Sequence, residues 1–223
     1  MKKLIACCFV ALACDTLLAN DKLGIDFFKS NFSLKEKYGK EIYGKNLGGI
    51  NIFGQHYLKG NMFIEYGYEY MRSKKEKTLN AGDYFPGGIA IAPTWFISNT
   101  KIKQQSPYFG IGYEYGFGEK TSISLLGSIA VIRVTGYHEV IDSGFGPIPQ
   151  AVTAATKRNF DKTKPSVLFK LSINHEFNNC WGARLTGTWR KLDQFKIKAK
   201  DSLTSEIRLK NCASVGLGVF YNL

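Results

Sequence analysis

The last nine residues, Val215-Gly216-Leu217-Gly218-Val219-Phe220-Tyr221-Asn222-Leu223, decide the fold. Apolar or aromatic side chains occupy every second position from Val215 to Leu223. This strict alternation predicts a β-strand with one apolar face. Because an unpaired apolar edge strand invites aggregation, we expect this strand to pair with the first strand of a closed sheet.

The other end of the chain predicts a cleaved secretory signal peptide over residues 1–19. Lys2 and Lys3 precede an apolar run from Leu4 to Cys14, and Leu17-Leu18-Ala19 offers a cleavage site before Asn20. This run is too short for a transmembrane helix. No other segment has about 18 consecutive apolar residues, so no membrane-spanning helix is expected elsewhere.

Residues 20–223 suit a single domain. Cys7, Cys8 and Cys14 belong to the predicted signal, which leaves Cys180 and Cys212. Two cysteines provide neither a disulfide framework nor zinc-ligand spacing. Cleavage before Cys14, as in a lipoprotein, is the alternative processing, but position 11 lacks the usual Leu. The formal net charge of the chain is +12.

Short turns and long connections alternate along the chain. Three Gly- or Asn-containing turns predict β-hairpins: Lys59-Gly60-Asn61, Gly118-Glu119-Lys120 and Asn178-Asn179-Cys180. The expected strands are 22–29, 48–58, 62–71, 108–117, 121–134, 166–177, 181–189 and 211–223. The expected long connections are 30–46, 72–106, 136–164 and 190–210. This layout predicts an even number of strands, with both termini of the chain on the same side as the short turns.

The two faces of each strand differ in a way that decides between a soluble and a membrane barrel. In 62–71, an aromatic face containing Tyr66 and Tyr68 opposes a face containing Glu65 and Glu69. A soluble barrel such as a lipocalin buries its apolar face inside. Here the large aromatic face would have to lie outside, and the charged face could not form a dry core without partners. An apolar wall in lipid around a polar interior resolves the conflict.

On these residues, the chain resembles the small eight-stranded outer-membrane β-barrels of the OmpA-membrane-domain and OmpX type. Gly218, Tyr221 and Leu223 are similar to the C-terminal assembly signal of that family, although Leu223 stands where the family usually has Phe. The resemblance implies an all-β, antiparallel, up-and-down transmembrane barrel with three short periplasmic turns and four long extracellular loops. It also implies assembly by the outer-membrane barrel machinery, no cofactor and a monomer.

The interior of such a barrel is just wide enough for side chains to fill it. The predicted polar network in the lumen comprises Asp26, Glu65, Glu69, Glu114, Lys170, Glu176, Arg184 and Arg190. We expect Lys170 and Arg184 to neutralise Glu65 and Glu114, because buried charges need partners. This network predicts a polar plug, with a gated narrow ion path as the alternative. Inward glycines leave room for water.

The outer wall should carry an aromatic girdle in contact with lipid. The predicted members are Tyr66, Tyr68, Tyr70, Tyr113, Tyr115, Trp181, Trp189 and Tyr221. Within loop 72–106, the apolar run 87–97 is expected to extend a strand above the membrane, or to touch a partner or lipid. The segment 144–149 predicts a turn-rich loop tip.

The four long connections are basic and carry essentially all the net charge of the mature chain. Three interpretations remain open: rim residues such as Arg133 and Arg190 bind lipopolysaccharide phosphates, the loops adhere to acidic host or matrix polymers, or the loops are simply solvated. Nucleic-acid binding is not expected, because no recognition fold accompanies the charge.

Catalysis and a metal site are not expected. His56 and His175 fall near the periplasmic ends of their strands, and His138 with Glu139 and Ser143 matches no hydrolase motif. Cys180 and Cys212 should lie a barrel height apart, about 20–25 Å, too far for a disulfide.

The sequence therefore predicts a non-enzymatic surface protein of the outer membrane, for envelope integrity or adhesion. A narrow porin-like channel is the first alternative, and an enzyme that modifies lipid A or phospholipid is the second.

Overall fold

The computed structural model describes residues 21–36, 41–58, 60–80, 94–145, 154–192, 196–197, 207–209 and 211–223. The predicted signal peptide at 1–19, residues 87–93 of the apolar run and residues 146–149 of the predicted loop tip lie outside this part of the chain. Within the described residues, no helix is long and apolar enough to cross a membrane.

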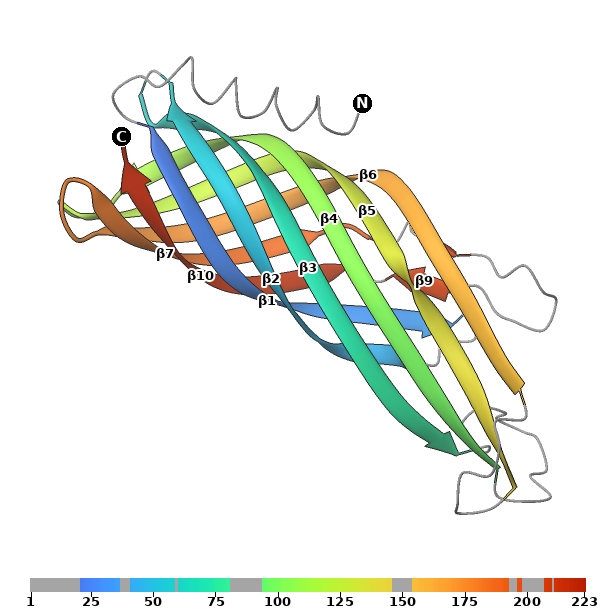
Figure 1. Ribbon diagram of the computed structural model, residues 1–223. Coiled ribbons are helices and arrows are strands. Elements are labelled where there is room, and N and C mark those ends of the chain that lie inside the picture. The colour runs from blue at the N-terminus through green and yellow to red at the C-terminus, as the bar shows by residue number, and fades with distance from the viewer. Residues whose placement is uncertain are drawn as a thin grey trace.

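Every regular element of the described chain is a β-strand. The strands are β1 (Lys22–Glu36), β2 (Glu41–Tyr57), β3 (Met62–Asn80), β4 (Thr94–Gly116), β5 (Thr121–Phe145), β6 (Ala154–Glu176), β7 (Trp181–Arg190), β8 (Lys196–Ile197), β9 (Ile207–Leu209) and β10 (Cys212–Asn222). Each strand from β1 to β6 pairs antiparallel with the next, β7 pairs with β10, and β10 pairs with β1. The sheet therefore closes into the barrel visible in Figure 1, which confirms the predicted fold class.

The two shortest strands extend barrel strands rather than adding new ones. β9 pairs with β1 at Leu34↔Leu209, just beyond the β10 pair Asn31↔Ala213. Between these two pairs β1 advances by three residues, from Asn31 to Leu34, whereas its partner advances by four, from Ala213 to Leu209. One extra residue on one side of a pair is the mark of a β-bulge. β8 in turn pairs with β9. The barrel remains eight-stranded, and the expected loop 190–210 contains the continuations of β7 and β10.

Four neighbouring strands are much longer than predicted. β3, β4, β5 and β6 have 19, 23, 25 and 23 residues, whereas β7 has 10. Much of the expected loops 72–106 and 136–164 is therefore strand, including Thr94–Ile97 of the predicted apolar run. The expected strand bounds came from the turns and from alternation within each segment, but backbone pairing continues wherever a neighbouring strand supplies partners. Figure 1 shows these strands running well beyond the rest of the barrel.

Beyond the barrel, the sheet divides in two. The β2–β3 pairing stops at Gly48↔Arg72, and the β6–β7 pairing stops at Leu168↔Arg190. Past these points β3–β6 form the long outer sheet, and β2, β1, β9 and β8 form the short outer sheet. The interior face of both sheets continues the interior face of the barrel.

The alternation of buried and exposed side chains along each strand shows which face lines the interior and which forms the outer wall. Along β6, Val167, Phe169 and Leu171 are exposed, whereas Leu168 and Lys170 between them are buried. The same inversion holds for β10, where Val215 and Leu217 are exposed. Large apolar side chains thus form the outer wall, and charged ones lie inside.

Candidate functional site

The centre of the lumen holds four charged side chains from four strands. The Lys170 ammonium lies 2.6 Å from Glu65 Oε1, and the Arg184 guanidinium lies 3.1 Å from Glu65 Oε2 and 2.7 Å from Asp26 Oδ2. All four side chains are at most 2% exposed. Two cations and two anions therefore form a neutral cluster, as a low-dielectric interior requires.

Neutral groups complete this central cluster. Gln55 and Tyr108 each donate a 2.7 Å hydrogen bond to Glu65, and Asn51 donates to Asp26 at 2.8 Å. The Arg184 guanidinium also lies 3.5 Å from the centre of the Phe53 ring, a cation–π contact. The carboxylates are thus held by hydrogen bonds as well as by charge.

A second ionic cluster lies at the end of the barrel that carries the short turns. The Lys22 ammonium is 3.2 Å from Glu114 and 3.4 Å from Glu176. Tyr57 and Ser122 also donate hydrogen bonds to Glu114. The prediction that Lys170 or Arg184 neutralises Glu114 is wrong, because those cations lie at mid-barrel beside Glu65. Lys22 reaches Glu114 because it starts β1 at the same end of the barrel where Glu114 ends β4.

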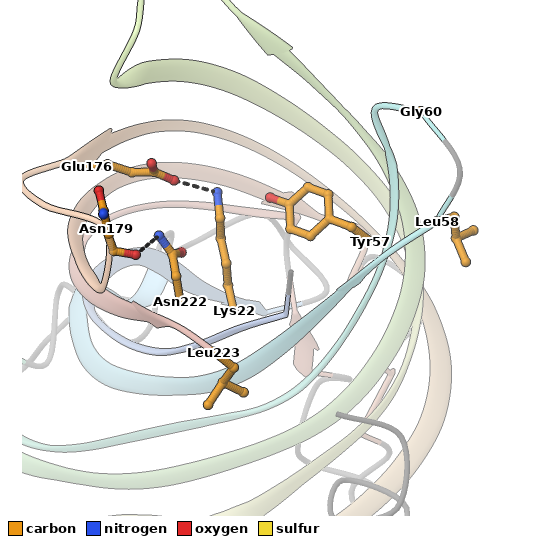
Figure 2. Close-up of a pocket in the computed structure, with 8 residues that line it drawn as sticks. All are labelled: Lys22, Tyr57, Leu58, Gly60, Glu176, Asn179, Asn222 and Leu223. Carbon is orange, nitrogen blue, oxygen red and sulfur yellow. Dashed lines mark hydrogen bonds and ion pairs between the residues drawn. The ribbon is translucent and has the colours of Figure 1, made fainter. Parts of the chain in front are cut away.

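An open vestibule of about 430 Å³ lies over this second cluster. Its lining residues are Lys22, Tyr57, Leu58, Gly60, Glu176, Asn179, Asn222 and Leu223. Figure 2 shows Lys22 and Glu176 meeting in the vestibule and Asn222 turned toward the backbone of Asn179. Lys22 and Glu176 therefore belong both to the second ionic cluster and to the lining of the vestibule.

The third ionic contact lies toward the outer sheets. The Arg190 guanidinium is paired with Glu69, and both residues are buried. Arg190 continues the inward series of Arg184, Thr186 and Thr188 along β7. The interpretation of Arg190 as a rim residue available to lipopolysaccharide is therefore wrong. All eight residues of the predicted lumen network face the interior, and they fall into these three separate clusters.

Aromatic rings occupy the space beside the inward glycines. A Cβ atom on Gly24 would lie 2.3 Å from the Phe53 ring, and one on Gly112 would lie 2.2 Å from the Phe63 ring. Rings packed on glycines of a neighbouring strand stabilise a sheet while filling the interior. The prediction that inward glycines leave room for water is wrong at these positions, since the ring of the adjacent strand takes that room.

An apolar layer closes the outer end of the lumen, where sequence reasoning predicts only polar side chains. We call it the apolar cap; it consists of Leu47, Met71, Ile102, Ile132, Val134, Phe160, Leu192 and Cys212, all buried in one cluster. These residues come from strands of both outer sheets, from the start of β10 and from the segment after β7. Ile132 and Val134 lie within the expected strand 121–134, on the same face as Ser124 and Ser128, so their alternation is a sequence signal for an inward apolar face at this end.

The predicted aromatic girdle lies on the outer wall. Its members Tyr66, Tyr68, Tyr70, Tyr113, Tyr115, Trp181, Trp189 and Tyr221 are half-buried or exposed. The ring centroids of Trp181 and Tyr221 are 5.0 Å apart in an edge-to-face arrangement, and those of Trp189 and Phe169 are 5.9 Å apart. Trp181 and Trp189 stand at opposite ends of β7, so they mark the two edges of the apolar band.

Basic side chains stand on the outer wall just beyond this band. We call Lys29, Arg72, Lys103 and Arg133 the basic belt. Arg72 pairs across strands with Lys103, and Lys103 lies 5.5 Å from the Tyr70 ring. Arg133 makes a two-point contact with Asp161. The belt thus follows strands β1, β3, β4 and β5 on the side of the outer sheets.

The residues of the predicted C-terminal signal have clear places in the barrel. Gly218 lies opposite Asp26, and a Cβ atom there would come 2.1 Å from the Asp26 carboxylate. Tyr221 contacts Trp181, and the amide of Leu223 donates to the carbonyl of Asp21 at 2.8 Å. Gly218 thus makes room for the central ionic cluster, and its recognition by assembly machinery stays a prediction.

The histidines and cysteines form no recognisable catalytic group among the described side chains. His56 bonds Asp21 at 2.8 Å, and His175 bonds Thr121 at 2.9 Å. The side chains of His138 and Ser143 lie outside the described residues. Cys180 is exposed and Cys212 buried, and both are free. Within the described part of the chain, no group of three His, Cys, Asp or Glu residues is placed to hold a metal ion.

Neither a family model nor a curated protein matches this sequence. Solved structures do match its fold. Neisserial surface protein A aligns with a TM-score of 0.54 at 8% identity, over 91% of this chain and 97% of that one. The outer membrane protein OprG from Pseudomonas aeruginosa has a TM-score of 0.48 at 10% identity, over 91% and 95% of the two chains. Ail, the attachment invasion locus protein of Yersinia pestis, has a TM-score of 0.47 at 12% identity, over 92% and 99%. With its closed antiparallel barrel, apolar wall and ion-paired lumen, this chain has the fold of the small eight-stranded outer-membrane β-barrels.

Proposed function

We propose that this protein is a closed, non-enzymatic barrel of the outer membrane that displays its two outer sheets at the cell surface. One observation carries the proposal: a continuous apolar wall surrounds a lumen of paired charges. Soluble proteins rarely expose apolar patches beyond a few hundred Å². Lipid around the wall removes that exposure to water. In a closed barrel the backbone N–H and C=O groups form hydrogen bonds between strands and need no water.

The basic belt supports an orientation with the outer sheets outside the cell. Lipopolysaccharide fills the outer leaflet and carries phosphates at the level of its head groups. Arginine and lysine bind phosphates through charge-assisted hydrogen bonds. We therefore infer that Arg72, Lys103 and Arg133 contact those phosphates. Asp161 then sets the direction of the Arg133 guanidinium without neutralising the whole belt.

A triple substitution tests the belt. Changing Arg72, Lys103 and Arg133 to Gln should reduce the thermal stabilisation that added lipopolysaccharide gives to the barrel in detergent. The matched control is Lys120→Gln, which removes an exposed charge at a short turn. Equal stabilisation of the triple variant and the wild type would count against the belt as the contact with lipopolysaccharide.

The lumen favours a barrel that does not conduct ions. The central cluster, the Arg190–Glu69 pair and the apolar cap lie one after another along its interior. Ions would have to separate buried pairs and then cross an apolar layer. We expect purified barrel in planar lipid bilayers to give no current steps above the lipid baseline. Steady unitary currents would instead support the narrow-channel alternative.

The role at the surface then rests on the two outer sheets and the basic segments that join their strands. If the protein maintains the envelope, cells that lack it should be more sensitive to detergents than cells that have it. If it is an adhesin, cells that lack it should bind acidic polymers more weakly, with no change in detergent sensitivity. The enzyme alternative predicts a mass change in lipid A or phospholipid between strains with and without the protein, and we expect identical spectra.

A further inference from the structure

The vestibule at the short-turn end of the barrel is an open space of about 430 Å³, the size of a site for a small organic molecule. Lys22, Glu176 and Asn222 line it from three different strands (Figure 2). Lys22 begins β1, Glu176 ends β6, and Asn222 ends β10. The closed sheet therefore fixes the positions from which these three side chains reach the vestibule.

The charges at the vestibule do not cancel among the described residues. Lys22 contacts two carboxylates, Glu114 at 3.2 Å and Glu176 at 3.4 Å. The side chain of Glu114 is only 12% exposed, and it also accepts hydrogen bonds from Tyr57 and Ser122. The side chain of Glu176 is 35% exposed, and it shares Lys22 with Glu114. One negative charge is therefore left over in this cluster, and it faces the open space at Glu176.

The same space lacks a hydrogen-bond donor. Lys22 donates to Glu114, and Asn222 Nδ2 donates to the carbonyl of Asn179 at 3.2 Å. Asn222 Oδ1 has no donor among the described residues, whereas most buried polar atoms in native proteins have a partner. The Asn222 side chain is only partly buried, so a turn about its Cβ–Cγ bond can bring this oxygen to the vestibule. A donor with a positive charge would complete both Glu176 and Asn222.

The surroundings favour an organic cation over a metal ion. Calcium and magnesium take about six or more oxygen ligands. Within the described part of the chain, no three acidic, His or Cys side chains are placed together to hold a metal. The exposed side chains of Leu58 and Leu223 also line the vestibule, and an aliphatic chain can cover them. An ammonium group on such a chain matches the charge, the acceptors and the apolar surface together.

We propose that the vestibule binds an aliphatic ammonium group, with Glu176 as its ion-pair partner and Asn222 as a hydrogen-bond acceptor. Leu58 and Leu223 pack against the carbon chain of the ligand. Two sources offer this chemistry, a free polyamine and the lysine side chain of a peptide. The site lies at the end of the barrel opposite the outer sheets, so it does not depend on the surface role proposed above.

The test is isothermal titration calorimetry of the purified barrel in detergent micelles. One series uses 1,5-diaminopentane, and the other uses N-acetyl-lysine methylamide. We expect saturation at one ligand per barrel, and the ligand that binds more tightly identifies the source. Glu176→Gln should weaken this binding about tenfold or more, because a hydrogen bond to a charged group is lost. The matched control is Glu119→Gln, which removes the same charge from an exposed position in a neighbouring short turn and should keep the wild-type affinity.

A variant of opposite sign separates this site from general attraction between charges. Lys22 competes with the ligand for Glu176, so Lys22→Met should tighten binding. Lys120→Met, at an exposed turn position, should not. Saturation by neither ligand would overturn the proposal, and so would equal losses of affinity in Glu176→Gln and Glu119→Gln.

Each variant must first show the heat-dependent gel shift of a folded barrel. If Lys22→Met fails this check, Glu176→Gln and its control decide. If Glu176→Gln fails, Glu176→Asp is measured instead. The shorter side chain draws the carboxylate back from the vestibule, and wild-type affinity of this variant would overturn the proposal.

Discussion

Replacing Glu65 by Gln tests whether the central charges form a buried network that stabilises the barrel. Glu65 accepts hydrogen bonds from Lys170, Arg184, Gln55 and Tyr108. Gln preserves the size of the side chain but leaves the cluster with two cations and only Asp26 as an anion. Lys170 then has lost the one carboxylate that contacts it in this cluster.

The size of the effect follows from burial. Lys170 and Glu65 are 2% and 1% exposed, so solvent screens their interaction little. Removing one partner of a buried pair costs about 3–5 kcal/mol, because it leaves the other charge uncompensated. Glu65→Gln/Lys170→Met restores neutrality, and we expect it to be more stable than Glu65→Gln alone. The two substitutions should couple by about 1–3 kcal/mol.

The assay is equilibrium unfolding in urea from lipid vesicles, followed by tryptophan fluorescence and by gel shift. With a slope of about 2 kcal/mol per M urea, Glu65→Gln should lower the midpoint by roughly 2 M. The matched control is Gln55→Leu, which removes one neutral donor to Glu65 and leaves every charge in place. Strictly additive effects of the Glu65 and Lys170 substitutions would refute the reasoning, because they would mean that water screens the pair and the lumen is open.

Three further outcomes follow from the wall and the packing of the barrel. In SDS gels, unheated protein from the outer-membrane fraction should migrate differently from boiled protein, and identical mobilities would contradict a closed barrel. Gly112→Ala should destabilise the barrel by about 1–3 kcal/mol through overpacking against Phe63, measured by urea unfolding. Gly116→Ala, with nothing within 4 Å of the added Cβ, should be close to neutral. A maleimide should label Cys180 but not Cys212 in the folded barrel, and peptide mass mapping that finds both labelled would contradict the burial of Cys212.

Local pattern was enough to predict the strands, their facing and the closure of the sheet. The side-chain period of a strand is two residues, so the alternation around Lys170 or from Val215 to Leu223 reports facing without any knowledge of distant segments. The same period places the eight charged residues of the predicted network inside. Local pattern was misleading about strand length, because pairing partners on the neighbouring strands decide where β3 to β6 stop.

Contacts across the lumen depend on strand tilt and stagger, which a local pattern does not contain. Lys22 and Glu114 are 92 positions apart, and only the closed barrel brings them to the same end. The strand period predicts that Arg190 points inward, but only the stagger of the closed sheet brings it to Glu69.

The sequence by itself determined an eight-stranded barrel with an apolar wall and a charged interior, because alternation and turn chemistry are local properties of the chain. Only the tertiary structure decided which charges pair, where the rings fill the space beside glycines, and that Leu192 and Phe160 help to cap the lumen. The physical reason is that these contacts join residues far apart in the chain, and their meeting is set by the stagger of the whole closed sheet.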